Sequence, residues 1–400
     1  MFNKLSLVWN CGSSSLKFAI INPLSDKKYL SGNVECLKLP NSRIMWFDHL
    51  KYKKNIKYIK NISHKKAINF VFNNILKKNI LLFNKIKVIA HRIVHGGNKL
   101  TSSTLINNKV INLIKSSSVF APLHNPAHLI GIYESIKNYP NLSKKNVAVF
   151  DTSFHMTMPK KSYLYGIPYK LYKNYGIRRY GAHGISYQYI VYKTSKIFNK
   201  KKNKLNIIVC HLGGGASISS IKNGKIIDTS MGLTPSEGLL MGTRSGDIDI
   251  SIIFFLYEYL SITMKDIKNL LSKQSGILGL TEKSSDFRYI EKRYYKNSKA
   301  IIALNVFCHR LSKYIGGYIT LINKYLDAIV FTGGIGENAT IMRKLTINKF
   351  SLFNIIIDKK KNKNIVGKSG FINKINTIPI LILPTDEELI IAKEGINLIK

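Results

Sequence analysis

Arginine is scarce in this chain, and its placement indicates anion chemistry. Of the 62 basic residues only nine are arginine, and the rest are lysine. Lysine cannot replace arginine where a planar fork of N–H donors must hold a carboxylate or a phosphate. More than half of the arginines lie in stretches that also contain glycine or histidine: Arg92, Arg178, Arg179, Arg244 and Arg288. We therefore expect a site that binds an anion through several of these side chains.

Two histidines flank one of these arginines. In VIAHRIVHGG (88–97), Arg92 lies between His91 and His95, just before a glycine pair. A strand that ends in a glycine turn would also explain this pattern. A zinc site is the weaker alternative, because the first histidine is followed by arginine rather than glutamate and no third ligand is evident. An anion clamp formed by Arg92 is the favoured interpretation.

Other polar residues that could take part in catalysis follow apolar or glycine-containing runs. Asp151 comes after the apolar run of VAVFDTSFH (147–155), where it is either a turn or capping residue or an active-site carboxylate. His183 lies between small residues, so it could closely approach a reacting phosphoryl group. Arg244 is followed by Asp247 and Asp249, and an internal salt bridge competes there with an exposed site framed by glycines. Arginines, a histidine and a carboxylate are the groups that phosphoryl transfer uses.

Three glycine- or serine-rich turns supply donors for phosphate. NCGSSSLKF (10–18) and HLGGGAS (211–217) each join two apolar runs, and FTGGIGEN (331–338) leads from an apolar run into a helical pattern. Neither a Walker A loop nor a dinucleotide fingerprint is present. A serine-rich hairpin turn without a ligand is the alternative for the first of them. The repeat of strand, turn and strand predicts two related domains that face one cleft.

Strand and helix patterns alternate over much of the chain, so the predicted class is α/β. We place the domain boundary near Phe150, giving domains at 1–150 and 151–385, with a terminal helix at 386–400 that packs back on the first domain. Thr385 is the expected N-cap of that helix. One buried helix face is predicted from apolar residues spaced 3, 4, 3 and 4 apart: Ile301, Leu304, Cys308, Leu311 and Ile315.

Composition narrows the functional classes. The net charge of +41 first suggests nucleic-acid binding, but lysine is spread through Lys/Asn/Ile-rich segments, which indicates a general bias in residue usage and a solvated surface. The apolar stretches are too short to span a bilayer. The amino-terminal stretch lacks an export signal, and the four cysteines lack disulfide or zinc spacing. These features predict a cytoplasmic protein with no membrane or specific nucleic-acid partner.

The combination of motifs resembles the acetate kinase family over nearly the whole chain. The motifs occur in the family's order and approximate spacing: NCGSSSLKF, HRIVHGG, APLHNPAH, VFDTSFH, RRYGAHG, HLGGGAS, GLTPSEGLLMGTRSGDID, FTGGIGEN and PTDEEL. The resemblance implies two ribonuclease-H-like domains of the actin-like ATPase type that flank a nucleotide cleft. It also implies a homodimer and reversible phosphoryl transfer from ATP to acetate with Mg²⁺, for which Mn²⁺ is an alternative.

The resemblance assigns roles by matching motifs. It implies that Asn10 and Glu387 support the metal, that Arg92 binds the substrate carboxylate, and that Asp151, His183 and Arg244 are catalytic. His124 would lie near the transferred group. The implied ATP-binding residues are Ser13, Ser15, Lys17, His211, Leu212, Gly213, Gly214, Gly215, Asp286, Phe287, Arg288, Gly334, Ile335, Gly336, Glu337 and Asn338.

The implied acyl pocket and two departures from the family pattern bear on specificity. The pocket would be lined by Val94, Leu123, Ala182 and Pro235. Ala182 is small where some members carry an aromatic residue, so propionate is an alternative substrate. Gly214 replaces the usual asparagine, and GISYQ replaces the usual sequence after His183, which leaves fewer donors. The rival hypotheses are a propionate or butyrate kinase, a basic nucleic-acid-binding protein and a scaffold without activity.

Overall fold

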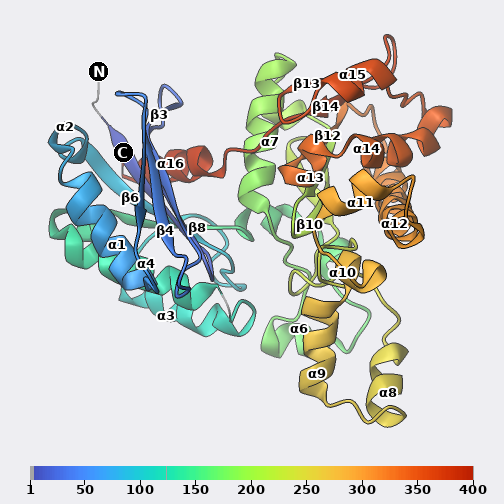
Figure 1. Ribbon diagram of the computed structural model, residues 1–400, viewed down its shortest axis with the longest axis horizontal. Helices are drawn as coiled ribbons and strands as arrows, with labels where there is room; N and C mark the ends of the chain where they lie inside the picture. The colour runs from blue at the N-terminus through green and yellow to red at the C-terminus, as the bar shows by residue number, and fades with distance from the viewer. Residues whose placement is uncertain (1–3, 123, 400) are drawn as a thin grey trace. The chain divides into compact units, whose positions relative to one another are not determined.

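The chain forms two compact units, each built around one β-sheet (Figure 1). The computed structural model describes residues 4–122 and 124–399. The first unit runs to Phe154 and includes the segment from Asp386 onward, and the second unit spans His155–Thr385. Helices and strands are mixed in both units, so the predicted α/β class is confirmed.

The sheet of the first unit combines an antiparallel half with a parallel half. Its strand order is β5-β4-β3-β2-β1-β6-β8-β7, in which β1 to β5 form an antiparallel meander and β1, β6 and β8 are parallel. The strands are β1 (Leu5–Cys11), β2 (Leu16–Asn22), β3 (Lys27–Glu35), β4 (Arg43–Asp48), β5 (Lys53–Tyr58), β6 (Ile86–Ile93), β7 (Thr104–Leu105) and β8 (Asn146–Phe150).

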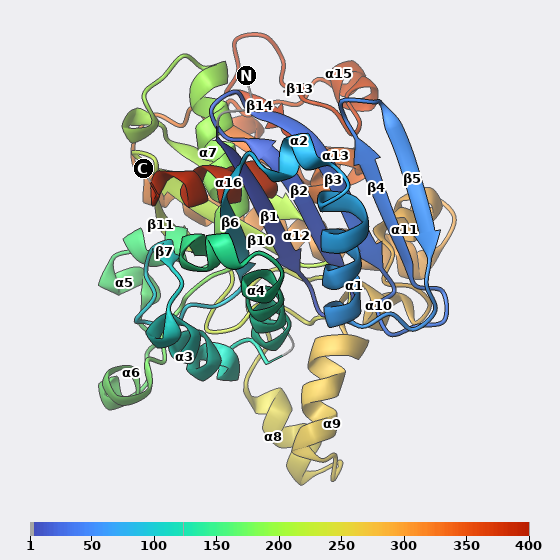
Figure 2. The ribbon, with the colours of Figure 1, turned by 90° about the vertical axis from the view of Figure 1, so that its left-hand side faces the viewer.

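Successive side chains of β1 point to opposite faces of the sheet, and helices cover both faces. Leu7 and Trp9 belong to the apolar cluster that includes residues of α1 and α4. Ser6 lies on the opposite face, where its hydroxyl donates to the Ala392 carbonyl of α16 at 3.1 Å. Because alternate residues of a strand share a face, Asn10 also points toward the α16 side. Figure 2 shows α1 and α4 in front of this sheet, with α16 crossing it.

The helices of the first unit cover both faces of this sheet. A residue with a side-chain oxygen caps each of three of them: Ser63 before α1, Asn107 before α3 and Asp386 before α16. The predicted N-cap at Thr385 is therefore wrong by one residue, since the Asp386 carboxylate accepts from the Leu389 N–H. The α-helices are α1 (His64–Phe70), α2 (Ile80–Phe83), α3 (Asn108–Ser116), α4 (Asn125–Asn138) and α16 (Glu387–Asn397).

The sheet of the second unit repeats the arrangement of the first. Its order is β11-β10-β9-β12-β14-β13, with β9, β10 and β11 antiparallel and β9, β12 and β14 parallel. The same order and directions occur in β3-β2-β1-β6-β8. The strands are β9 (Ile207–Leu212), β10 (Ala216–Lys222), β11 (Lys225–Thr229), β12 (Ala328–Thr332), β13 (Gly370–Phe371) and β14 (Ile380–Ile382).

One long helix forms much of the core of the second unit. Leu304, Cys308, Leu311 and Ile315 of α12 are buried as predicted, but Ile301 is 36% exposed and does not belong to that core. The α-helices of this unit are α5 (Lys160–Tyr163), α6 (Tyr169–Tyr175), α7 (Gly184–Ile197), α8 (Ser251–Glu258), α9 (Met264–Asn269), α10 (Gly276–Thr281), α11 (Phe287–Arg293), α12 (Ser298–Ile322), α13 (Gly333–Asn338), α14 (Thr340–Ile347) and α15 (Lys359–Asn364). Across residues 4–122 and 124–399, the helices are too short or too polar to cross a membrane.

The first sheet packs closely around the glycine at position 32. A Cβ on Gly32 of β3 would lie 2.4 Å from the Phe18 ring and 2.6 Å from the Met45 carbonyl oxygen. We expect Gly32→Ala to reduce the free energy of unfolding by about 1–3 kcal/mol, because the buried ring and the neighbouring strand must move. Urea unfolding followed by fluorescence measures this directly, since the chain's two tryptophans, Trp9 and Trp46, both lie in this sheet.

Gly166→Ala is the matched control, because no atom lies within 4 Å of its Cβ position. Its midpoint of urea unfolding should equal that of the wild type. Circular dichroism is used for this comparison because it reports on both units. An unchanged midpoint for Gly32→Ala would contradict the close packing described for β3.

Candidate active site

Strand geometry brings three polar residues of the first unit together. Because β1, β6 and β8 are parallel, their carboxyl ends meet at one edge of the sheet. Asn10 lies near the end of β1, Arg92 near the end of β6, and Asp151 directly follows β8. The register places Arg92 beside Val149, two residues before Asp151. The period of two therefore directs all three side chains to the α16 face.

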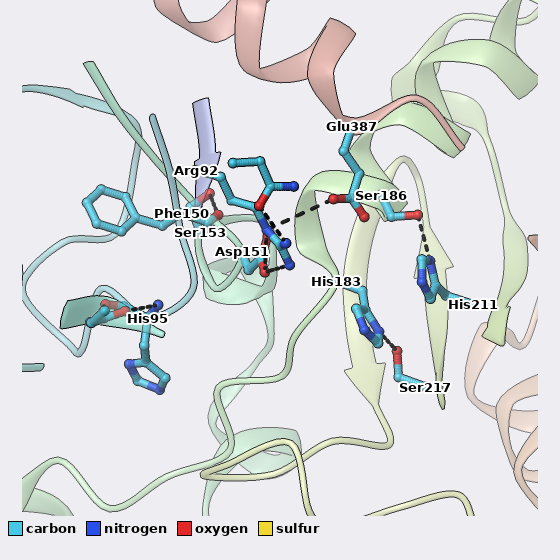
Figure 3. A network of polar contacts seen from close by, with 12 residues as sticks. Arg92, His95, Phe150, Asp151, Ser153, His183, Ser186, His211, Ser217 and Glu387 are labelled. Carbon is cyan, nitrogen blue, oxygen red and sulfur yellow. Dashed lines mark hydrogen bonds and ion pairs between the residues drawn. The ribbon is translucent and has the colours of Figure 1, made fainter. Parts of the chain in front are cut away.

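Arg92 and Asp151 form a forked ion pair (Figure 3). Arg92 Nη2 donates to Asp151 Oδ2 at 2.6 Å, and Nε lies 3.1 Å from both carboxylate oxygens. Nη1 donates to Asn10 Oδ1 at 3.1 Å. The Asp151 side chain is 2% exposed, whereas that of Arg92 is 20% exposed. The carboxylate is thus enclosed, whereas part of the Arg92 side chain remains accessible.

Burial and charge act on this pair in opposite directions. Burial raises the pKa of Asp151 above its ordinary value, and the charge of Arg92 opposes that rise. Burial also disfavours the charged form of Arg92, but Asp151 and Glu387 outweigh it, so its pKa lies above the usual value. We conclude that Arg92 keeps its positive charge throughout the physiological range.

The histidines beside Arg92 are buried and hydrogen-bonded. Burial lowers the pKa of His91 to about 4, and its Nε2 is hydrogen-bonded to Asn146 Oδ1 at 2.8 Å. The His95 ring accepts from the Gly97 N–H at 3.0 Å through Nδ1. Within the described part of the chain, no three His, Cys, Asp or Glu side chains form a group that could hold a metal. The zinc alternative at this stretch therefore has no support.

Two oxygen-bearing side chains at this edge suit a magnesium ion. The Glu387 carboxylate, on the first residue of α16, lies 4.0 Å from Arg92 Nε, and Asn10 Oδ1 is bonded to Nη1 of the same guanidinium. Mg²⁺ is usually bound by one or two protein oxygens and takes its other ligands from phosphates and water. Asn10 and Glu387 therefore fit such an ion.

The predicted phosphate turn lies between β1 and β2. Ser13 and Lys17 are exposed and Ser15 is half-buried. Lys17 pairs with Asn10 across the antiparallel ladder. The turn thus presents its polar groups to solvent next to the strand that carries Asn10.

The residues predicted for an acyl pocket belong to both units. Val94 is half-buried one residue after β6, and the half-buried His124 contributes to the electrostatic field at Asp151. Leu123 lies outside the described residues. Ala182 is buried in the core of the second unit and Pro235 is half-buried in the same unit. The composition of this pocket stays a prediction.

In the second unit, His183 is held in an unusual backbone conformation. It precedes α7 with φ 60° and ψ 22°, which is left-handed and uncommon outside glycine. Its Nδ1 is 2.8 Å from Ser217 Oγ, and its ring stacks on His211 with centroids 4.1 Å apart. Ser217 is also hydrogen-bonded to Tyr187. These contacts fix the direction of the imidazole.

The glycine turn between β9 and β10 lies close to the side chains of Arg244 and His183. Gly213 N–H donates to the Gly215 carbonyl at 2.9 Å, which closes the turn. The Cβ position of Gly215 is 3.6 Å from both Arg244 Nη1 and His183 Nε2. No atom lies within 4 Å of the Cβ position of Gly214. The turn therefore has open space beside donors suited to phosphate.

Arg244 does not form the internal salt bridge that was one alternative. Its Nη1 donates to the Pro235 carbonyl at 2.9 Å, and no ion pair to Asp247 or Asp249 occurs in the described structure. Burial lowers its pKa from the usual value. A half-buried guanidinium without a carboxylate partner remains able to bind an anion.

A pocket of about 640 Å³ in the second unit has the size of a small-molecule site. Its lining includes these predicted residues: Gly213, Gly214, Asp286, Phe287, Arg288, Gly334, Ile335 and Asn338. It also includes residues that we did not predict: Ser285, Glu291, Lys292 and Ala339. The remaining residues predicted for ATP in this unit do not line it: His211, Leu212, Gly215, Gly336 and Glu337.

Two of the predicted residues that do not line the pocket, Glu337 and Gly336, hold α13 against its surroundings. The Glu337 carboxylate accepts backbone N–H groups of Gly333 and Thr385, and burial raises its pKa. A Cβ on Gly336 would lie 3.4 Å from the Phe331 carbonyl carbon, so this residue packs closely against β12. These residues fix the position of α13, whose residues line the pocket.

Sequence reasoning missed the residues that orient the two histidines. Ser217 lies opposite His211 in the ladder, and Ser186 Oγ is 2.8 Å from His211 Nδ1 and donates to Thr385 Oγ1 at 2.9 Å. Ser217 lies in HLGGGAS, and strand alternation could have placed it on the face of His211. Ser186 and Tyr187 come from GISYQ, where fewer donors were expected.

Comparison with known proteins gives one consistent match. The model of the acetokinase family matches residues 5–393. An acetate kinase of Wigglesworthia glossinidia brevipalpis is 56% identical over 397 residues, which cover 99% of each chain. An acetate kinase of Escherichia coli (strain K12) is 54% identical over 400 residues and the full length of both chains. The crystal structure of a propionate kinase from Francisella tularensis subsp. tularensis SCHU S4 matches with a TM-score of 0.91 and 43% identity, covering 99% of this chain and 100% of that one.

The buried pair predicts a specific pattern of stabilities. Arg92→Ala leaves Asp151 buried without its partner and should lower the free energy of unfolding by about 3–5 kcal/mol at pH 7. The loss of stability should shrink as pH falls. Without Arg92, burial raises the pKa of Asp151 in the folded protein above its value in the unfolded chain. Such a carboxyl destabilises the fold only at pH values above the unfolded-state pKa. Urea unfolding at pH 4.5 and pH 7 measures this difference.

The double variant Arg92→Ala/Asp151→Asn is the control, because it removes the charge that would be left unpaired. It should be more stable at pH 7 than Arg92→Ala alone. An equal loss in both variants would mean that the pair contributes packing rather than charge compensation.

Proposed function

Because this chain belongs to the acetokinase family, we propose that it catalyses the reversible transfer of the γ-phosphate of ATP to acetate, giving acetyl phosphate and ADP. Full-length acetate kinases at 54–56% identity support the substrate. The observation that carries the proposal is the partly exposed side chain of Arg92, whose guanidinium is held by a buried carboxylate.

Arg92 has donors left for a substrate carboxylate. A guanidinium has five N–H groups. Asp151 accepts from the Nε–H and from one N–H of Nη2, and Asn10 accepts from one N–H of Nη1. One N–H therefore remains on each Nη nitrogen, and two such donors match the two oxygens of acetate. We assign substrate binding to this fork.

Asp151 acts on the reaction through Arg92. Acetate is already ionised at neutral pH, so the attacking oxygen needs no general base. Asp151 is enclosed and points its oxygens at the guanidinium. We assign it the task of orienting Arg92 and of balancing its charge.

His183 and Arg244 are proposed to stabilise the transferred phosphoryl group. Both lie 3.6 Å from the Cβ position of Gly215 in the glycine turn. If the Ser217 hydroxyl donates to His183 Nδ1, the imidazole proton resides on Nε2 and points to the turn. In-line transfer depends mainly on alignment and on cancelling charge on the equatorial oxygens, and these two donors supply both.

The nucleotide is assigned to the 640 Å³ pocket of the second unit. Its lining combines the glycine turn with the amino end of α13 and the forked pair of Arg288 and Asp286, joined at 2.7 Å. Asn10 and Glu387 would hold Mg²⁺, which supplies charge neutralisation for the phosphates when bound. Mn²⁺ is the alternative ion.

Propionate is the second candidate substrate. The structural match to a propionate kinase supports it, as does the small side chain of Ala182. One additional methylene usually changes kcat/KM by roughly 10–200-fold in either direction. A direct comparison of the two acids therefore separates the alternatives.

A homodimer is also proposed, on the basis of an apolar helix. No residue of α8 is fully buried, and Ile252, Phe254 and Phe255 are 44%, 54% and 52% exposed. Exposed apolar surface of this kind is typical of protein interfaces. A second copy of this chain is the proposed occupant, because two identical apolar helices can cover each other by two-fold symmetry.

The activity test traps acyl phosphate as the hydroxamate. Wild-type protein with ATP and Mg²⁺ should form product with acetate, and Arg92→Ala should lower the rate by about 10²–10³ because the carboxylate loses its fork. Arg43→Ala is the matched control, since Arg43 also pairs with a carboxylate, Glu35, but is 42% exposed on the surface. It should retain full activity.

The same assay with propionate settles the substrate. Acetate should give the higher kcat/KM, and a preference for propionate would favour the alternative kinase. Absence of hydroxamate from the wild type with either acid would overturn the proposed function.

The dimer test uses light scattering coupled to size-exclusion chromatography. The wild type should elute at twice the chain mass, and Phe254→Asp should elute as a monomer because a charge disrupts the apolar contact. Tyr175→Asp is the control, because this tyrosine is 67% exposed on α6. A monomeric wild type, or a dimeric Phe254→Asp variant, would contradict the assignment of α8.

A further inference from the structure

The segment that carries Arg244 has no regular secondary structure. It connects β11 to α8, and Arg244 lies near its centre. Gly242 N–H donates to the Gly214 carbonyl at 3.3 Å, which brings the segment beside the glycine turn. A guanidinium on a loop needs an anchor if it is to meet developing charge at a fixed place.

Asp247 closes this loop with both its backbone and its side chain. Its N–H donates to the Gly238 carbonyl at 2.9 Å, and its Oδ1 accepts from the Gly238 N–H at 2.7 Å. These reciprocal bonds join the two ends of residues 238–247. Arg244 lies within the closed loop, three residues before Asp247.

The same aspartate fastens the loop to the core helix. Its Oδ2 accepts from the Tyr314 hydroxyl at 2.6 Å, and its carbonyl oxygen accepts from Arg310 Nη1 at 2.9 Å. Arg310 and Tyr314 are four residues apart on α12, so they share one face of that helix. The other faces of α12 include residues of the buried core. Asp247 thus connects the loop that carries Arg244 to the long core helix of the unit.

The loop has little room to adjust. Gly246 has φ 68°, and a Cβ there would lie 2.5 Å from the carbonyl oxygens of Gly238 and Leu239. Gly238 has φ 101°. With such close backbone contacts, a shift at Asp247 must be passed to its neighbours rather than absorbed.

We infer that Asp247 is the positioning residue for Arg244, acting through the closed 238–247 loop and its hydrogen bonds to α12. This inference rests on the proposed role of Arg244 in phosphoryl transfer. Asp247 does not bond to Arg244, so its effect is on where the loop lies and not on the charge of the guanidinium. A pocket of about 480 Å³, lined by Asp247, Arg310 and Tyr314 among others, borders this anchor, so water can reach the groups left after a substitution.

The main experiment is a double-variant cycle in the full-length protein. Arg244→Ala should lower kcat by about 10²–10³. Asp247→Ala should lower kcat by up to about 10²-fold with the KM values for ATP and acetate unchanged, because misplacement affects the transition state rather than binding. Arg244→Ala/Asp247→Ala should be no slower than Arg244→Ala, since the anchor has no use without the arginine.

Two further variants grade the effect. Asp247→Asn keeps the acceptor for the Gly238 N–H, and its amide can donate to the Tyr314 oxygen, so it should restore most of the rate. Tyr314→Phe loses one hydrogen bond and should lower kcat by about 2- to 13-fold. This milder variant keeps the test valid if Asp247→Ala fails to fold.

Asp327→Ala is the matched control for a purely structural loss. Asp327 is 5% exposed, accepts from the Asn206 N–H at 2.7 Å and pairs with Lys200 at 2.7 Å, so its removal should lower the melting temperature without lowering kcat. Unchanged kcat in both Asp247→Ala and Tyr314→Phe, or additive losses in the double variant, would overturn the inference alone. Full activity of Arg244→Ala would instead overturn the role of Arg244, and the inference with it.

Discussion

The buried ion pair of Arg92 and Asp151 constrains the architecture of the first unit. Two charges taken out of water are tolerated only if their geometry is good and their remaining hydrogen-bonding groups are satisfied. Here the Asp151 carboxylate accepts hydrogen bonds from Nε and Nη2 of Arg92, and Asn10 Oδ1 accepts one from Nη1. That arrangement requires the ends of three parallel strands to lie at one edge of the sheet. It also requires the three side chains to point to the same face.

The chain returns to the first unit at its end, where α16 packs on the strands that carry the ion pair. The first residue of α16, Glu387, places a second carboxylate near Arg92, and the helix covers the face to which Asn10 and Arg92 point. Gly395 of α16 packs against Ala90 and Val88 of β6, where a Cβ would lie 2.9 Å from the Ala90 methyl. Close helix packing and charge placement therefore depend on the same element.

The two units share one topology but present different groups at the corresponding turn. In the first, the turn after β1 presents hydroxyls, and the strand ends present charged groups. In the second, the corresponding turn after β9 is three glycines, so it offers backbone groups and open space. Charged groups can pair with a small anion, whereas bare backbone lets a bulky group approach closely.

Much of this could be predicted from residue types and local order. The hairpins, the α/β class, the core face of α12 and the family follow from periodicity and motifs, because these depend on neighbours along the chain. Details that depend on the exact course of the chain could not be predicted: the N-cap of α16 is Asp386 rather than Thr385, and Ile301 lies outside the core. Residue types alone establish which groups the protein has for anion chemistry. The folded arrangement establishes which of them meet, since hydrogen bonds such as those of Asp247 to α12 join residues more than sixty positions apart.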